Sequence, residues 1–143
     1  MNRLMRILLI LPVVMISIQT NAETIKVSSL KQLVEYAKLS NNTIVMKPGI
    51  YKMTDYMIAD SISSRIKSKN YSYIVFSGNN NRYKLAGVTI EIDTRLREQL
   101  KFPIHTNEIE LRGNNNFIEG LYIRNVNNGL SPGGATFNVS GTG

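Results

Sequence analysis

Six basic residues, grouped in two short segments, are the side chains of this sequence that are best suited to binding chemistry. They are Arg65, Lys67 and Lys69 in residues 60–73, and Arg95, Arg97 and Lys101 in residues 94–107. Arginine can donate two parallel hydrogen bonds to a carboxylate or sulfate group, and lysine supplies a compact positive charge. The set predicts a basic rim that binds a polyanionic sugar chain, with two solvated surface loops as the simpler alternative.

Other residues that could do chemistry are isolated in the sequence. His105 is the only histidine and could act as a general base, but no partner for it is apparent. Glu91 and Asp93 could bind calcium, although a surface ion pair between Glu91 and Arg124 is the simpler interpretation. Tyr122 could stack on a sugar ring or pack on a strand. We therefore add Tyr122 and Arg124 to the candidate sugar-binding residues and assign no catalytic residue and no metal ligand.

A repeat in the sequence predicts the strands that would position these residues. The sequence GNNN occurs at residues 78–81 and 113–116, each time between two runs of alternating apolar residues. A later glycine, Gly87 or Gly120, divides the second run, and FNVSGTG begins a third copy at residues 137–143. The leading glycines of the three copies are 35 and 28 residues apart, a period typical of stacked repeats.

Alternation assigns one face of each expected strand to the core. The inward residues are Ile74, Phe76, Val88, Ile90, Ile92, Ile109, Leu111, Leu121 and Ile123. Short strands at this period, with no room for a crossover helix inside a repeat, predict an all-β, right-handed parallel β-helix. A leucine-rich repeat is the alternative, but the asparagine of that motif would come one place late, at Asn127.

The GNNN segment is expected to form the corner of each coil. Glycine supplies a positive φ without steric cost, and asparagine tolerates the left-handed region. Stacking of the coils would place Asn80 and Asn81 next to Asn115 and Asn116, in a ladder of side-chain hydrogen bonds. The same register places Glu91 beside Arg124.

An amphipathic helix is expected over residues 29–39. Leu30, Leu33, Val34 and Ala37 recur at helical spacing, and Ser29 with Gln32 forms a capping box. The helix would cover the open end of the first coil, and residues 43–143 would form the first coils.

The helix, the segment TIVMKPGIY at residues 43–51, the GNNN corners and the segment GLYIR at residues 120–124 together resemble a known superfamily. They look like the N-terminal part of bacterial right-handed parallel β-helix proteins of the pectate-lyase-like superfamily, similar to the start of alginate lyases and chondroitinase B. The glycine–aspartate pair common before such a first strand is Asn41-Asn42 here.

The resemblance implies a polysaccharide lyase. In that superfamily a basic residue removes the proton beside a uronate carboxylate, which calcium or basic side chains neutralise. Those groups usually lie on later coils, and no residue of this sequence matches a catalytic motif. The resemblance therefore implies no cofactor in this stretch, and allows calcium in a full-length protein.

Residues 1–22 predict a secretory signal peptide. Arg3 and Arg6 precede an apolar run of about a dozen residues, which is shorter than the ~20 that a spanning helix needs, and small residues follow. We expect cleavage after Ala22, a secreted or periplasmic protein, and no stable membrane insertion afterwards.

The net charge and the cysteine content limit the kinds of partner that the protein can have. Cleavage would remove two of 17 basic residues and leave 15 against 10 acidic ones, a formal charge of +5. This excess suits an acidic polysaccharide, although a secreted basic protein can simply be soluble, and we expect no nucleic-acid partner. The absence of cysteine excludes disulfides and thiolate metal sites.

The last segment, FNVSGTG, starts a coil and ends at its corner. A terminal repeat needs a cap, so we expect residues 23–143 to be the N-terminal portion of a longer β-helix. The remaining coils of that longer chain would then pack on this portion as its partner. The expected function is that of an exported carbohydrate-active protein, with a non-catalytic surface or adhesion protein that binds glycan as the alternative. The portion alone is expected to be inactive.

Overall fold

The computed structural model describes residues 22–68, 72–99, 107–127 and 137–140. In chain order the elements of this part are β1 (Glu23–Val27), α1 (Leu30–Tyr36), β2 (Asn42–Met46), β3 (Gly49–Lys52), the 3₁₀ helix η1 (Met53–Asp55), α2 (Ala59–Ser68), β4 (Ile74–Phe76), β5 (Arg82–Asp93), α3 (Leu96–Gln99), β6 (Ile109–Leu111), β7 (Phe117–Val126) and β8 (Phe137–Val139).

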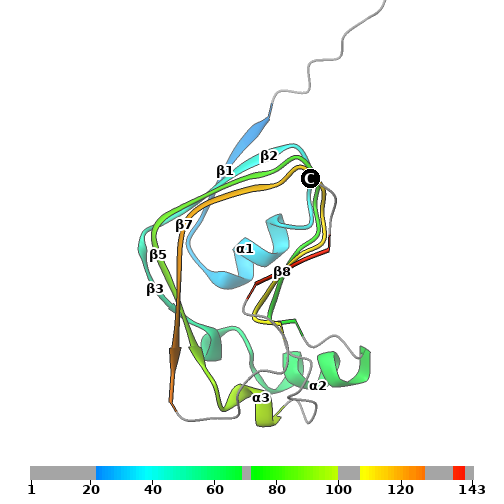
Figure 1. Ribbon diagram of the computed structural model, residues 1–143, viewed down its shortest axis with the longest axis vertical. Coiled ribbons are helices and arrows are strands. Elements are labelled where there is room, and N and C mark those ends of the chain that lie inside the picture. Colours follow the sequence, from blue (N-terminus) through cyan, green and yellow to red (C-terminus); the bar gives the residue numbers. More distant parts are fainter. Residues whose placement is uncertain (1–21, 69–71, 100–106, 128–136, 141–143) are drawn as a thin grey trace, which may run out of the picture.

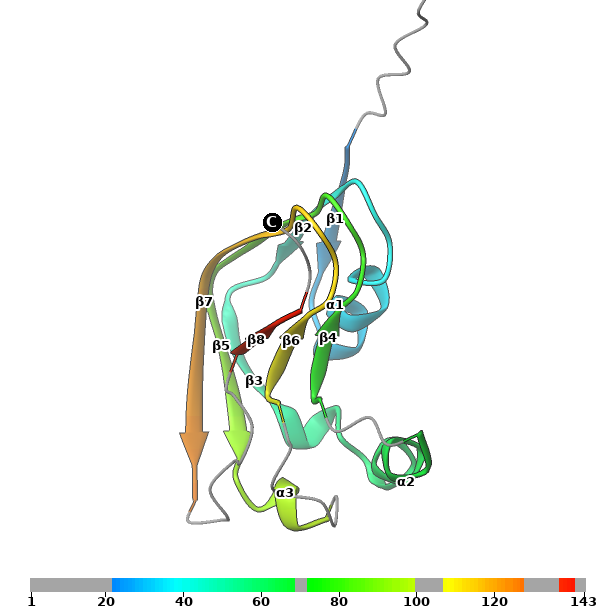
Figure 2. The same cartoon turned by 45° about the vertical axis from the view of Figure 1, so that its right-hand side comes forward.

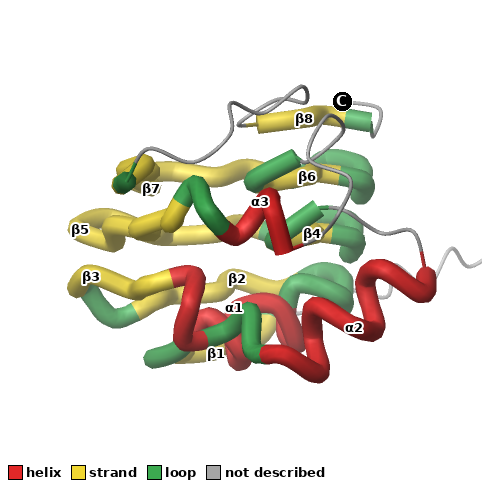
Figure 3. Tube along the Cα trace, turned by 90° about the horizontal axis from the view of Figure 1, so that it is seen from below, coloured by secondary structure: helices red, strands yellow, loops and turns green. Residues whose placement is uncertain are grey.

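The strands form two parallel sheets on opposite sides of the molecule (Figure 1). Sheet A has five strands, in which β1 pairs with β2, and β5 pairs with β2, β3 and β7. Sheet B has three strands in the order β4-β6-β8. Figure 3 shows that the strands lie in layers, with β5 between β3 and β7.

The repeat determines the register of both sheets. Ile74 lies opposite Ile109 in sheet B, and Glu91 lies opposite Arg124 in sheet A, so each copy of the repeat pairs in parallel with the next. The register of β5 with β7 shifts between Lys84 and Val88, around Gly87. Parallel pairing between copies, which the sequence pattern predicts, is confirmed.

The predicted all-β fold class is wrong. The described chain is a mixed α/β structure, because three α-helices and a 3₁₀ helix accompany the two parallel sheets. The sequence interpretation treated residues 60–73 and 94–107 as loops, but α2 and α3 lie in these segments. In α2 the spacing of Ile62 and Ile66 gives the segment an apolar helical face, with Ile62 buried. The leucine-rich-repeat alternative is not supported either, because each copy places strands in both sheets rather than one strand in a single sheet.

Helix α1 occupies the place that its sequence pattern predicts, but it is shorter, ending at Tyr36. The Ser29 hydroxyl accepts a hydrogen bond from the backbone N–H of Gln32 at 3.2 Å, as in a capping box. The Gln32 side chain accepts from the N–H of Ser28 at 2.9 Å. Leu30 and Leu33 are buried, and the helix contacts β1, β2 and β4, so it covers the core at the β1 end of the layers (Figure 3).

The core lies between the two sheets. Of the residues that alternation assigns inward, Leu111, Leu121 and Ile123 are partly buried, and the others are buried: Ile74, Phe76, Val88, Ile90, Ile92 and Ile109. Ile44, Tyr83 and Ile118 follow one another across three layers of sheet A. Phe76 of sheet B meets Tyr83 edge to face, with ring centroids 4.6 Å apart. Burial raises the pKa of Tyr83 to about 12, although its hydroxyl accepts a hydrogen bond from Asn81.

The corners form a ladder of asparagines. The Asn115 side chain donates to Asn80 Oδ1 at 3.2 Å, and the Asn80 side chain donates to Asn41 Oδ1 at 3.0 Å. All three have a positive φ, of 53°, 56° and 64° respectively. Asn41 therefore belongs to a third corner, Leu39 to Asn42, which the sequence interpretation treated only as the end of a helix.

Gly78 and Gly113, the leading glycines of the two GNNN corners, do not supply the positive φ that the sequence pattern predicts. The glycines with positive φ in the described chain are Gly49, Gly87 and Gly120, and neither Gly78 nor Gly113 is among them. A Cβ on Gly113 would lie 1.8 Å from the carbonyl oxygen of Gly78, and one on Gly78 would lie 1.7 Å from that of Leu39. Glycine is required at the corner because the backbones of successive layers approach closely there.

Candidate functional site

A groove of about 580 Å³ lies between α2 and the outward surface of sheet B. Figure 2 shows α2 beside β4, at the end of the molecule opposite the corners. The charged residues that line this groove are Lys38, Asp60, Arg65 and Arg112. We call it the serine groove because hydroxyl groups from Tyr56, Ser61, Ser64, Ser68 and Ser77 also line it. Its lining therefore combines three cations, one carboxylate, five hydroxyls and two valine side chains.

Helix α2 supplies one wall of the serine groove. Ser61, Ser64, Arg65 and Ser68 recur at intervals of three and four residues, so they share one face of the helix. Ile62 points to the core, which turns the hydroxyl face toward the groove. This spacing was visible in the sequence, and it would have predicted the wall if residues 60–68 had been interpreted as a helix.

Arg65, a predicted sugar-binding residue, holds α2 in place. Its guanidinium donates to the carbonyl oxygen of Ser72, to that of Tyr73 at 2.9 Å and to the Tyr56 hydroxyl at 3.2 Å. It also lies over the Tyr56 ring, 5.8 Å from the centroid. Its charge reaches the groove, but most of its donors are occupied by the protein itself.

Arg112 forms the opposite wall from a position directly before the second GNNN corner. Its Nη2 lies 2.9 Å from Glu110 Oε2, and the Ser72 hydroxyl donates to the same carboxylate. Arg112 holds the pKa of Glu110 below its usual range, with partial burial opposing and Ser72 reinforcing the effect. Glu110 is therefore ionised at neutral pH and is a weak proton acceptor. The carboxylate in turn raises the pKa of Arg112.

Lys38 lies on the rim of the serine groove, just after α1, and its side chain is exposed. It forms no ion pair with the part of the chain that the structure describes. Sequence analysis missed both Lys38 and Arg112, because neither lies in the two basic segments and only the packing of α2 brings them near Arg65.

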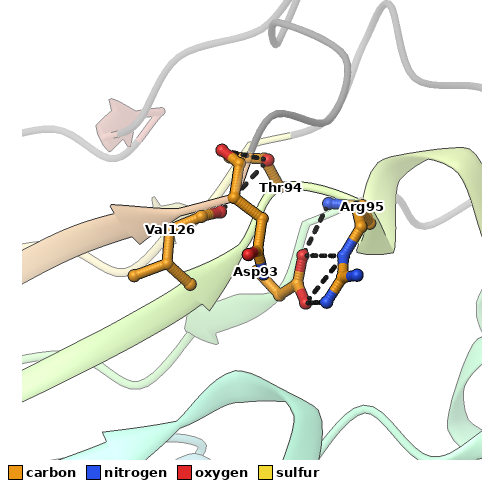
Figure 4. A network of polar contacts seen from close by, with 5 residues as sticks. Asp93, Thr94, Arg95 and Val126 are labelled. Atoms are coloured by element: carbon orange, nitrogen blue, oxygen red, sulfur yellow. Dashed lines mark hydrogen bonds and ion pairs between the residues drawn. The ribbon is translucent and has the colours of Figure 1, made fainter.

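Arg95 is bound tightly to the end of its own strand (Figure 4). Its guanidinium contacts Asp93 at 2.6 Å, and its backbone N–H donates to the same carboxylate at 2.9 Å. Arg95 holds the pKa of Asp93 well below its usual range. The hydroxyl of the intervening Thr94 donates to the carbonyl oxygens of Val126 and Asn127, at 3.2 and 3.1 Å, so this turn also joins β5 to β7.

Of the six residues of the predicted basic rim, Arg65, Lys67 and Arg95 have described side chains, and among these three Arg65 lines the serine groove. Lys67 is exposed on α2 and does not line the serine groove. Arg97 lies on α3, but the structure does not describe its side chain. Lys69, Lys101 and His105 lie outside the described residues.

Tyr122 and Arg124 lie on the outward surface of sheet A, away from the serine groove. Arg124 forms an ion pair with Glu91, as the register predicts, and Tyr122 lies opposite Thr89. Tyr122 is 62% exposed, and Phe117 on the same strand is 53% exposed, with the Arg82 guanidinium 4.8 Å from its ring centroid.

Within the described ranges, no cluster of three or more histidine, cysteine or acidic side chains is arranged to hold a metal ion. Glu91 and Asp93 are each paired with an arginine. None of the helices in those ranges has the length and apolar character needed to cross a membrane.

Two comparisons, with models of protein families and with curated proteins, found no relative of this chain. No protein-family model matches the chain, and no curated protein matches it significantly.

Proposed function

We propose that this chain binds an acidic polysaccharide in the serine groove, as part of an exported carbohydrate-active protein. The observation that supports this proposal is the lining of the groove, in which Lys38, Arg65 and Arg112 outnumber the single carboxylate of Asp60. Cations favour the carboxylates of a polyuronate, and the surrounding hydroxyls can exchange hydrogen bonds with those of sugar rings. A neutral glycan would lack the first of these interactions.

Binding is favoured over cleavage as the function of this part of the chain. Lyase chemistry needs a group that removes a proton. The pKa of Arg112 is raised, which keeps it a proton donor, and Glu110, which pairs with Arg112 but does not line the groove, has a lowered pKa that makes it a weak base. The cations of the groove are suited to neutralising a uronate carboxylate, which is a binding role. The alternative of a surface or adhesion protein that binds glycan uses the same groove.

The experiment is a titration of the purified chain with polygalacturonate and alginate, followed by calorimetry, with dextran as the neutral control. The decisive variant is Lys38→Ala, because the Lys38 side chain is exposed and forms no ion pair with another described residue. We expect it to weaken binding by about fivefold to tenfold, with a smaller salt dependence than the unaltered protein.

Lys84→Ala is the matched control, since Lys84 is an exposed lysine on the outward surface of sheet A. Equal loss in the two lysine variants would contradict the groove as the site, and equal affinity for dextran would contradict the acidic substrate class. The ultraviolet absorbance of an unsaturated uronate, followed in the same samples, would show cleavage and favour the lyase.

A further inference from the structure

Strand β3 has a free edge beside a second groove. It pairs with β5 along residues Gly49 to Lys52, and it has no other strand partner within the described part of the chain. The preceding layer does not reach it, because β1 ends at Val27, opposite Met46, and the chain then turns into α1. A free edge presents backbone N–H and C=O groups that can pair with another extended segment.

The second groove, of about 510 Å³, follows this edge. We call it the edge groove, and its lining includes Lys31, Ile50, Lys52, Asp55, Tyr56 and Ile58. Ile50 is 61% exposed and Ile58 is 56% exposed, so apolar surface lies beside the backbone of β3. A strand edge together with an adjacent apolar groove is the arrangement that proteins use for strand addition, in which backbone bonds give affinity and pockets for alternate side chains give specificity.

The charges of the edge groove indicate the composition of its partner. Lys31 and Lys52 line it against one carboxylate, that of Asp55. Lys52 lies opposite Glu91 in the register, but the Glu91 carboxylate is bound by Arg124. Neither lysine forms an ion pair with another described residue. The groove therefore has an excess of one positive charge among its lining residues.

We infer that the edge of β3 binds an extended peptide in which apolar residues alternate with acidic ones. The peptide adds a strand to sheet A at Gly49 to Lys52. Lys52 faces outward on β3 and Tyr51 faces the core, so the carboxylates of the peptide lie on the outward face beside Lys52, and its apolar side chains lie on the inward face beside Leu30 and Tyr51. The inference does not depend on polysaccharide binding, but the two grooves adjoin, because Tyr56 and Ser61 line both.

The test uses the whole chain, labelled for NMR, and an acetylated, amidated hexapeptide of alternating glutamate and valine. We expect the amide signals of β3 to shift and their hydrogen exchange to slow on addition of the peptide. Lys52→Glu should weaken binding about tenfold, whereas Lys84→Glu, the same charge reversal on a neighbouring strand of sheet A, should leave the affinity unchanged.

Two control peptides separate strand addition from general attraction. A hexapeptide of alternating lysine and valine should bind at least about tenfold more weakly. A glutamate–valine peptide in which every backbone nitrogen is methylated can donate no backbone hydrogen bond from either edge, and it should fail to protect the β3 amides. The inference is overturned if the glutamate–valine peptide leaves the β3 amides unshifted, if the methylated peptide binds equally well, or if Lys84→Glu weakens binding as much as Lys52→Glu.

Discussion

The side chain of Asn116 clamps the backbone around Asn81 in the preceding layer. Its Oδ1 accepts from the N–H of Asn81 at 3.0 Å, and its Nδ2 donates to the carbonyl oxygen of Gly78 at 2.7 Å. Asn81 repeats the arrangement one layer further, with the N–H of Asn42 at 2.9 Å and the carbonyl oxygen of Leu39 at 2.7 Å. The third asparagine of each corner thus satisfies both a donor and an acceptor of the layer beside it.

Asn81→Ala should lower the free energy of unfolding by about 2–4 kcal/mol, because Asn81 is 2% exposed and its loss leaves buried backbone groups of the preceding corner without partners. Asn80→Ala removes bonds at an exposed position and places alanine at a φ of 56°, so it should cost about 1–2 kcal/mol. Urea unfolding of both variants measures the difference. Equal costs would show that the buried clamp is no stronger than the exposed ladder.

Gly113→Ala should destabilise the chain by about 3 kcal/mol or more, because the added methyl would lie 1.8 Å from the carbonyl oxygen of Gly78. Gly113→Asn should be at least as harmful, since close approach rather than a positive φ requires glycine there. Gly87→Asn is the contrast, because Gly87 has a φ of 75° and its added Cβ would come no closer than 3.1 Å to Pro48. If asparagine were tolerated at Gly113 and rejected at Gly87, this explanation of the corner would be wrong.

Arg65→Ala should release α2 from the strand that follows it. The loss of hydrogen bonds to the carbonyl oxygens of Ser72 and Tyr73 should cost about 1–3 kcal/mol and speed hydrogen exchange in α2 more than in sheet A. Lys67→Ala, two residues later on the same helix, should leave both measurements unchanged within about 0.5 kcal/mol. Uniform acceleration of exchange in both sheets and α2 would contradict a local anchoring role.

Acid should destabilise the chain partly through Glu110. Its folded-state pKa is lowered, so the carboxylate contributes stability that is present above the unfolded value of about 4.3 and is lost as pH falls through the folded value. Glu110→Gln should therefore flatten the fall in the urea midpoint below about pH 4.5, with Glu98→Gln on α3 as the control. An unchanged acid slope in the Glu110 variant would contradict the pairing with Arg112 and Ser72.

The sequence alone predicted the features that repeat. Equivalent residues of two copies, such as Glu91 and Arg124, carry the same spacing from Gly87 and Gly120, and that spacing is sufficient to set the parallel register. Alternation assigned Ile74, Phe76 and Val88 to the core, because side chains on a strand point to opposite faces in turn. These are local properties that the order of residues encodes directly.

Only the tertiary structure decided the fold class and the candidate site. Whether residues 59–68 form a helix depends on an apolar surface that can bury Ile62, and that surface is built from segments distant in the chain. Lys38, Arg65 and Arg112 come from three such segments, and they line one groove because α2 docks beside sheet B. The requirement for glycine at Gly113 likewise depends on an oxygen atom 35 residues earlier, at Gly78, whose position no local pattern specifies.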